Sequence, residues 1–192
     1  MTFENLHNLN SNSMKAIRLI ALAACMAATL DASAQEQEIR LFSHRGGRME
    51  HDENTFSAFQ ASYDAGYRGF ETDIRMTRDG ELVITHDSSL ERTTDGTGTV
   101  EEKTEAEIRQ LATKQGNKMM FLDELLEFLE GKEGLYVEFE MKTKPEALYP
   151  EERLHAYCDK LYDAVMAVKP ADATFVFTSG DYRGLRYLQA KH

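Results

Sequence analysis

The sequence predicts an α/β domain in which the functional residues gather where the strands end. Two observations support this prediction. Segments with the residue alternation of β-strands are followed by segments with the apolar spacing of α-helices. In addition, residues 69–76 and 135–142 each place carboxylates on one face and apolar side chains on the other. Because ligands of α/β domains bind beyond the carboxyl ends of the strands, we expect the functional site at that end of the sheet.

The composition and charge describe one globular domain and argue against nucleic acid as its partner. The chain has 192 residues, of which 42% are hydrophobic, which is enough to build one packed core. Its formal net charge of -11 disfavours binding to a nucleic-acid backbone, because like charges repel. We therefore expect a partner of another class.

Residues 1–34 have the features of a signal peptide. A basic stretch that begins at Met14, a candidate for the true start, precedes an apolar run over residues 19–30 that is too short to span a membrane. Small residues then lead to a cleavage site after Ala34, which predicts an exported protein, periplasmic or extracellular. Alternatively, Cys25 could be lipidated as in a bacterial lipoprotein. We favour cleavage after Ala34, because cutting before Cys25 would leave a very short apolar region.

The remaining domain, residues 35–192, begins with a short strand and a loop suited to ligand binding. Residues 39–43 form the expected strand, with His44 at its carboxyl end. Gly46-Gly47 follows in a polar loop, where glycine lets the backbone approach a ligand closely. Cys158 is the single cysteine of this domain, so we expect no internal disulfide and a thiol buried as a small apolar side chain.

A helix is expected between this loop and the next strand. Asn54 or Thr55 can cap its first turn by accepting a backbone hydrogen bond, and Glu53 belongs to the same loop and helix start. The helix should run to about Ala65, because Gly66 supplies the residue that commonly ends a helix.

The strand over residues 69–76 places two carboxylates on one face. Side chains alternate along a strand, so Glu71 and Asp73 point to the same side. Asp79-Gly80 then predicts a hairpin turn, since the few residues before the next strand cannot make a parallel crossover. Folding about that turn should bring Asp73 roughly opposite His86. The hairpin therefore assembles two carboxylates and an imidazole.

Two short helices are expected after the hairpin. Residues 88–99 are rich in Thr, Asp and Gly, and form a loop by composition. Thr104 and Glu107 make a capping box, which predicts a helix from there to about Leu111. A second helix should occupy residues 123–130, where leucines recur at helical spacing.

Residues 135–142 repeat the pattern of the earlier carboxylate strand. Glu138, Glu140 and Lys142 share one face, opposite four apolar side chains. A third carboxylate and a cation thus reach the polar side of the sheet. The last expected elements are a helix over residues 150–168, a strand over 174–178 and a helix over 182–189.

The polar motifs occur in an order that resembles the glycerophosphodiester phosphodiesterase family. They are His44-Arg45-Gly46, Glu53-Asn54-Thr55, Glu71-Thr72-Asp73, Thr77-Arg78-Asp79-Gly80, His86-Asp87 and Glu140-Met141-Lys142. Each motif alone is weak, but the ordered set is specific. The resemblance covers residues 41–188 and implies a (β/α)8 barrel of the TIM type, with the site at its C-terminal rim. Such a barrel takes ~250 residues, so we expect an incomplete barrel with about five of its eight strands.

The resemblance also implies an activity, the metal-dependent hydrolysis of glycerophosphodiesters. The expected products are sn-glycerol 3-phosphate and an alcohol such as choline or ethanolamine. Glu71, Asp73 and Glu140 look like ligands of one divalent cation, and their oxygen donors suit Ca²⁺ or Mg²⁺. The implied partner is thus a small glycerophosphodiester.

Four further residues take roles by the same resemblance. His44 and His86 look like the general base and the general acid, because an imidazole titrates near pH 7. Arg45 and Lys142 look placed to hold phosphate oxygens, which the planar fork of arginine can bind in pairs.

Two alternatives stay open. The chain could be an inactive truncated remnant that binds only metal or phosphate, and an incomplete barrel should then lack a cooperative melting transition. It could also be a sphingomyelinase D-like phospholipase, although the motif set favours small soluble diesters.

Overall fold

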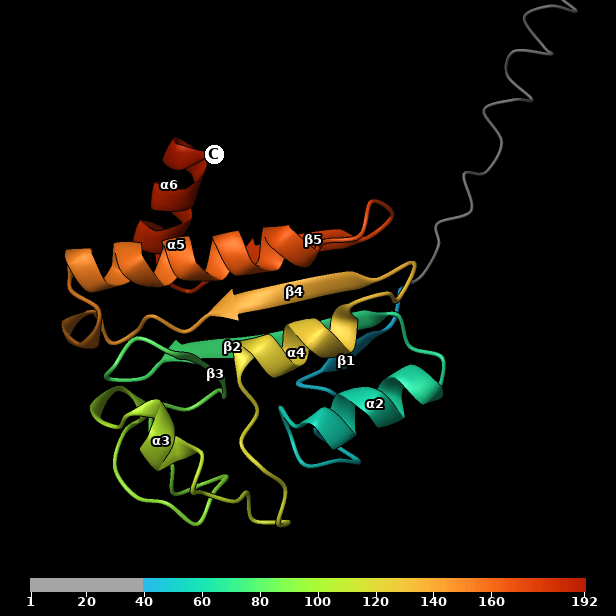
Figure 1. The fold of residues 1–192 in the computed structure, drawn as a ribbon, viewed down its shortest axis with the longest axis horizontal. Helices are drawn as coiled ribbons and strands as arrows, with labels where there is room; N and C mark the ends of the chain where they lie inside the picture. Colours follow the sequence, from blue (N-terminus) through green and yellow to red (C-terminus); the bar gives the residue numbers. More distant parts are fainter. Residues whose placement is uncertain (1–39) are drawn as a thin grey trace, which may run out of the picture. The chain divides into compact units, whose positions relative to one another are not determined.

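The computed structural model describes residues 40–192, which form one compact unit built on a five-stranded sheet (Figure 1). The strands are β1 (Phe42–His44), β2 (Gly69–Met76), β3 (Leu82–Ile84), β4 (Tyr136–Met141) and β5 (Thr174–Thr178). Four of them are parallel in the order β1-β2-β4-β5, and β3 pairs antiparallel with β2. Each parallel strand lies beside the next one along the chain, as in a β/α barrel and unlike a doubly wound sheet.

Five α-helices lie in the described residues, and the first two begin at capping side chains that the sequence predicts. The five helices are α2 (Phe56–Asp64), α3 (Glu105–Ile108), α4 (Leu122–Leu129), α5 (Glu151–Val168) and α6 (Tyr182–Lys191). Of the two residues expected to cap α2, Asn54 and Thr55, Thr55 is the cap, because its side chain accepts a hydrogen bond from the Ala58 N–H. Thr104 and Glu107 form the predicted capping box at the start of α3.

The core lies between the sheet and the helices α2, α4 and α5. Phe70 and Ile74 of β2, with Val137 and Phe139 of β4, are fully buried in one cluster that includes side chains of all three helices. Each such side chain contributes roughly 1.5–3 kcal/mol by leaving water. Cys158 of α5 is buried in the same cluster, as expected, and burial raises the pKa of its thiol to about 12.

Most predicted boundaries are confirmed. The strands over residues 69–76 and 174–178 match the prediction at both ends. The helix that was predicted to reach Leu111 ends at Ile108, and the first strand begins at Phe42.

The hairpin after β2 forms as expected, but the predicted register is wrong by one residue. The sequence predicts Asp73 roughly opposite His86. In the structure the Thr85 N–H donates a hydrogen bond of 2.9 Å to the Asp73 carbonyl, so Thr85 stands opposite Asp73. His86 therefore lies one residue further along, just beyond the β3 strand.

The reason for this shift is the length of the turn. The Thr77 N–H donates to the Glu81 carbonyl at 2.8 Å, which leaves three residues in the loop where the prediction has two. Gly80 takes a positive φ of 93° at the end of this loop, as three-residue hairpin loops require.

Several expectations fall outside the described residues. The signal peptide over residues 1–34, with the cleavage site after Ala34 and the lipidation site at Cys25, lies in that part of the chain. Among residues 40–192, no helix has the length and apolar character needed to cross a bilayer.

Candidate metal centre and active site

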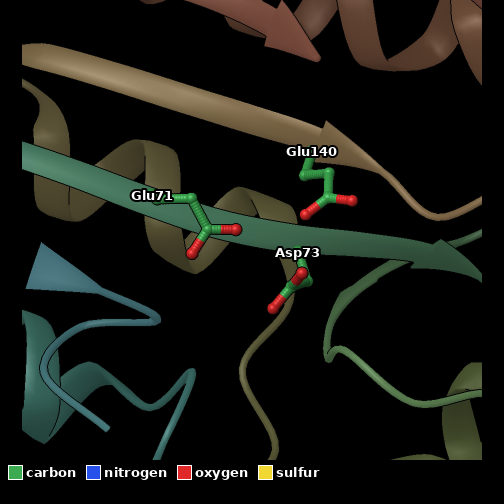
Figure 2. Close-up of side chains that lie close together, drawn as sticks. All are labelled: Glu71, Asp73 and Glu140. Carbon is green, nitrogen blue, oxygen red and sulfur yellow. The ribbon is translucent and has the colours of Figure 1, made fainter. Parts of the chain in front are cut away.

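Three carboxylates from two neighbouring strands converge at the carboxyl end of the sheet. Glu71 and Asp73 project from β2 and Glu140 from β4 toward the same space (Figure 2). The register pairs Asp73 with Glu140, so these two residues are direct neighbours across the ladder. Each of the three residues offers one oxygen, and these oxygens lie within 4.8 Å of one another. The structure thus brings together the three residues that the sequence analysis assigns to a cation.

The carboxylate cluster carries negative charge that the surrounding protein only partly balances. Burial, and then the neighbouring Asp73 and Glu140, raise the pKa of Glu71 to about 7. Glu71 Oε1 is buried and accepts no hydrogen bond, and the buried Asp73 Oδ1 accepts none either, although Lys142 Nζ lies 3.2 Å from it. Such atoms are costly in a protein interior unless a partner binds them. An all-oxygen donor set of this kind fits a hard divalent cation such as Ca²⁺ or Mg²⁺.

Two cationic side chains and one amide flank the carboxylate cluster. Lys142 Nζ lies 2.7 Å from Glu140 Oε1 and 3.2 Å from Asp73 Oδ1. Arg45 Nε lies 3.3 Å from Asp73 Oδ2, and Asn54 Nδ2 donates to that same oxygen at 2.9 Å. From the sequence, Asn54 is a possible helix cap and part of the Glu53-Asn54-Thr55 motif, and neither feature predicts its contact with Asp73.

His44 lies beside the cluster at the end of β1. Its Nε2 atom is 3.5 Å from Glu71 Oε2, and the parallel register pairs the two residues. Burial, and then the charges of Arg45 and Arg48, lower the pKa of His44. The imidazole is therefore biased toward its neutral form, which can accept a proton.

His86 lies in the segment that follows β3. Its Nδ1 atom is 2.6 Å from Asp87 Oδ1. Burial raises the pKa of Asp87, but hydrogen bonds from Arg92 and His86 outweigh this effect and bring it to about 2. An ionised Asp87 accepts a hydrogen bond from the Nδ1–H of His86, which leaves Nε2 available for other chemistry. The imidazole lines a cavity of about 240 Å³ together with Glu140 and Lys142.

A chain of ion pairs connects the loops that bear the two histidines. Arg92 contacts Asp87 through Nε and donates to both oxygens of Glu53 at 2.9 and 2.8 Å. Glu53 also accepts from Arg45 Nη1 at 3.1 Å. In the sequence, Glu53 belongs to the loop and helix start, and Arg92 belongs to the loop over residues 88–99. No sequence signal predicts their pairing, because the two residues are far apart along the chain.

Arg45 and Lys142 differ in what they leave free for a phosphate. The guanidinium of Arg45 is occupied by Glu53 and Asp73, and its side chain is only 10% exposed. Lys142 lines the cavity beside His86. The structure therefore brings both expected cations to the cluster, with Lys142 the more open toward the cavity.

Comparisons with known proteins agree with this arrangement. The description "Glycerophosphoryl diester phosphodiesterase family" belongs to the family model that matches residues 44–192. A glycerophosphodiester phosphodiesterase of Caldanaerobacter subterraneus is 36% identical over 123 residues, which cover 59% of this chain and 50% of that protein. One from Bacillus altitudinis is 30% identical over 111 residues, which cover 54% and 45%.

Solved structures show the same fold. The glycerophosphodiester phosphodiesterase of Agrobacterium tumefaciens aligns with a TM-score of 0.64 at 28% identity, over 79% of this chain and 62% of that one. An Oleispira antarctica phosphodiesterase, solved in complex with the product sn-glycerol-3-phosphate, aligns with a TM-score of 0.70 at 26% identity and the same coverage.

These structural neighbours are TIM barrels, so the predicted barrel type is confirmed, with five strands of an incomplete barrel described here. The chain spans about half the length of the curated relatives it matches. Because the family model extends from the first candidate histidine at residue 44 to residue 192, the chain belongs to the glycerophosphoryl diester phosphodiesterase family.

Proposed function

We propose that this chain contains the catalytic centre of an exported, metal-dependent glycerophosphodiester phosphodiesterase. The products would be sn-glycerol 3-phosphate and an alcohol. The observation that supports this most is the convergence of Glu71, Asp73 and Glu140 within 4.8 Å, with His44 beside Glu71 and His86 in the cavity that Glu140 lines. The sn-glycerol-3-phosphate bound to the Oleispira antarctica relative supports the substrate class.

A single Ca²⁺ or Mg²⁺ ion would be held by the three carboxylates. The unpartnered buried Oε1 of Glu71 and the raised pKa of that carboxyl both favour a bound cation. When bound, such an ion neutralises the charge that develops on the phosphoryl oxygens. Lys142, which borders the cavity, would bind a phosphate oxygen, and Arg45 would add the donors that Glu53 and Asp73 leave free.

The two imidazoles would move the protons. His44, whose pKa is lowered, takes the proton from the attacking water or hydroxyl. His86 gives a proton to the oxygen of the departing alcohol, while the Asp87 carboxylate stabilises the imidazolium that this step requires. One proton is thus accepted and one donated for each phosphorus–oxygen bond that is exchanged.

The test is the release of glycerol 3-phosphate from glycerophosphocholine by the purified chain. We expect turnover with Ca²⁺ or Mg²⁺, its loss with a chelator, and a loss of at least about 100-fold in His44→Ala and His86→Ala. Glu138→Gln is a matched control, because this residue lies on β4 outside the cluster. Turnover that persists in chelator, or release of a head group from sphingomyelin instead, would contradict the proposal.

A second candidate is a domain that binds metal but does not turn over substrate. The uncovered edge of the sheet favours this candidate. The residues of β5 at that edge are only partly buried, whereas β2 is buried throughout. Calorimetry, together with the turnover assay, separates the two candidates. A cooperative transition with turnover supports the enzyme, and metal binding without turnover supports the second candidate.

A further inference from the structure

We propose that Arg75 is a positioning residue of this site, whose guanidinium fixes the distance between His86 and Lys142. The inference rests on the function proposed above and adds a residue to it. Arg75 follows Asp73 by two positions on β2 and therefore lies on the same face of the sheet. Its side chain is 9% exposed, so its charged group is held inside the protein.

The guanidinium binds two chain segments that leave the sheet. Its Nε donates to the carbonyl of His86 at 2.9 Å. Its Nη1 donates to the carbonyls of Lys142 at 3.2 Å and Lys144 at 3.4 Å. One rigid planar group therefore joins the backbone that bears the imidazole to the backbone that bears the ammonium.

These contacts begin where the backbone ladders end. The last ladder bond on one side of β2 is donated by Thr85 to Asp73, and the last on the other side is donated by Lys142 to Ile74. Beyond those points neither segment pairs with β2 through its own N–H groups. Arg75 thus provides the link that the sheet no longer provides, directly at the two residues that need a fixed separation.

A buried carboxylate holds the guanidinium in one orientation. Glu101, whose side chain is 3% exposed, accepts from Arg75 Nη1 at 2.8 Å and from the Tyr149 hydroxyl at 3.0 Å. Its second oxygen accepts from the Ser88 hydroxyl at 2.7 Å. A buried ion pair of this kind adds little net stability, but it restricts the arginine to one geometry. Lysine cannot replace it, because its three donors sit on one atom and cannot reach both segments.

The proposal predicts a defect that depends on the leaving group. In the proposed reaction His86 protonates the departing oxygen. An alkoxide such as that of choline needs this proton, whereas nitrophenolate leaves readily without it. A displaced His86 should therefore slow the first type of substrate much more than the second, which a general loss of structure would not do.

The experiment compares kcat for glycerophosphocholine and for the p-nitrophenyl diester of glycerol 3-phosphate. In Arg75→Lys we expect a fall of at least about 10-fold for the first substrate and less than about 3-fold for the second. Arg153→Lys is the matched control, because Arg153 also donates to two carbonyls at the end of β2, those of Met76 and Thr77, each at 2.9 Å. It binds neither catalytic segment, so both rates should stay within about 2-fold.

His86→Ala separates failure of this proposal from failure of the proposed function. If His86→Ala shows the leaving-group dependence and Arg75→Lys does not, the role of Arg75 is refuted and the function stands. If His86→Ala slows both substrates equally, the proposed function itself is wrong.

Hydrogen exchange gives a readout that needs no turnover. In Arg75→Lys, exchange should increase in residues 85–88 and 142–145 and stay unchanged elsewhere, and a uniform change or none refutes the proposal. If this variant does not melt cooperatively, the double variant Arg75→Met, Glu101→Gln removes both buried charges and is measured in the same way.

Discussion

The metal-free protein should become less stable as the pH rises from about 4.5 to 7, and Glu71 should be the cause. Its pKa is about 7 in the folded chain, against an ordinary value of 4.5 for a glutamate carboxyl. The folded state therefore binds this proton more tightly than the unfolded state does. It follows that the contribution to stability is complete below about pH 4.5 and is lost as the pH rises through 7.

The size of this stability loss follows from the difference of about 2.5 between the pKa of Glu71 in the folded chain and its ordinary value. At ~1.4 kcal/mol for each pH unit, this corresponds to about 3 kcal/mol. For a protein of this size that free energy lowers the melting temperature by roughly 6–12 °C. Glu71→Gln replaces the carboxylate by a neutral group that can still accept the hydrogen bond of the Arg45 N–H. We therefore expect this variant to be the more stable protein at pH 7 in chelator.

The assay is thermal unfolding in chelator between pH 4.5 and 8, with Glu138→Gln as the matched control. The unmodified chain and the control should lose stability as the pH rises, and Glu71→Gln should not. Added Ca²⁺ or Mg²⁺ should restore the unmodified chain at pH 7 and have no such effect on Glu71→Gln. An equal pH slope in Glu71→Gln and the unmodified chain would show that another group titrates.

Two further predictions concern residues outside the carboxylate cluster. Arg92→Gln removes the ion pairs to Glu53 and Asp87 (Arg92 side chain 47% exposed), so we expect a stability loss of no more than about 1 kcal/mol in a melting curve. Turnover should fall about 10-fold, because Asp87 then holds His86 less firmly, and an unchanged kcat would contradict this. The thiol of Cys158 is fully buried with a pKa of about 12, so it should not react with a disulfide reagent at pH 8 until urea unfolds the chain.

The convergence of the three carboxylates could be predicted partly from local rules and partly from the family resemblance. Strand alternation places Glu71 and Asp73 on one face, and the same alternation places Glu140 on the polar face of β4. The parallel register then makes Asp73 and Glu140 neighbours. Alternation alone leaves both Glu138 and Glu140 on that face, and only the family resemblance points to Glu140, because the register joins two strands that are far apart along the chain.

The register of the hairpin could not be predicted to the residue. Asp79-Gly80 is compatible with a two-residue or a three-residue loop, and the choice depends on whether Thr77 or the next residue closes it. In the structure the Thr77 side chain accepts from the Glu81 N–H at 2.9 Å and binds Asp79 at 2.6 Å. These side-chain bonds favour the longer loop, and they move His86 beyond the ladder.

The ion-pair network around the site could not be derived from the sequence for a different reason. Arg75 pairs with Glu101 and Arg92 pairs with Glu53, and each pair joins segments that meet only in the folded chain. A pattern of residues shows that Arg75 shares a face with the carboxylates. It does not show which of the 33 acidic residues of the chain lies opposite.

The protein supplies positive charge to the three carboxylates unequally, and Glu71 receives the least. Asp73 has Arg45, Lys142 and Asn54 within 3.3 Å, and Glu140 has Lys142 at 2.7 Å. Among the described residues, Glu71 accepts a hydrogen bond only from the Arg45 backbone N–H, at 3.0 Å, and has an imidazole at 3.5 Å. A divalent ion would therefore supply to Glu71 the charge that the protein already supplies to the other two. Because Glu71 must lose a proton for this, the affinity for the ion should rise with pH up to about 7 and then level off.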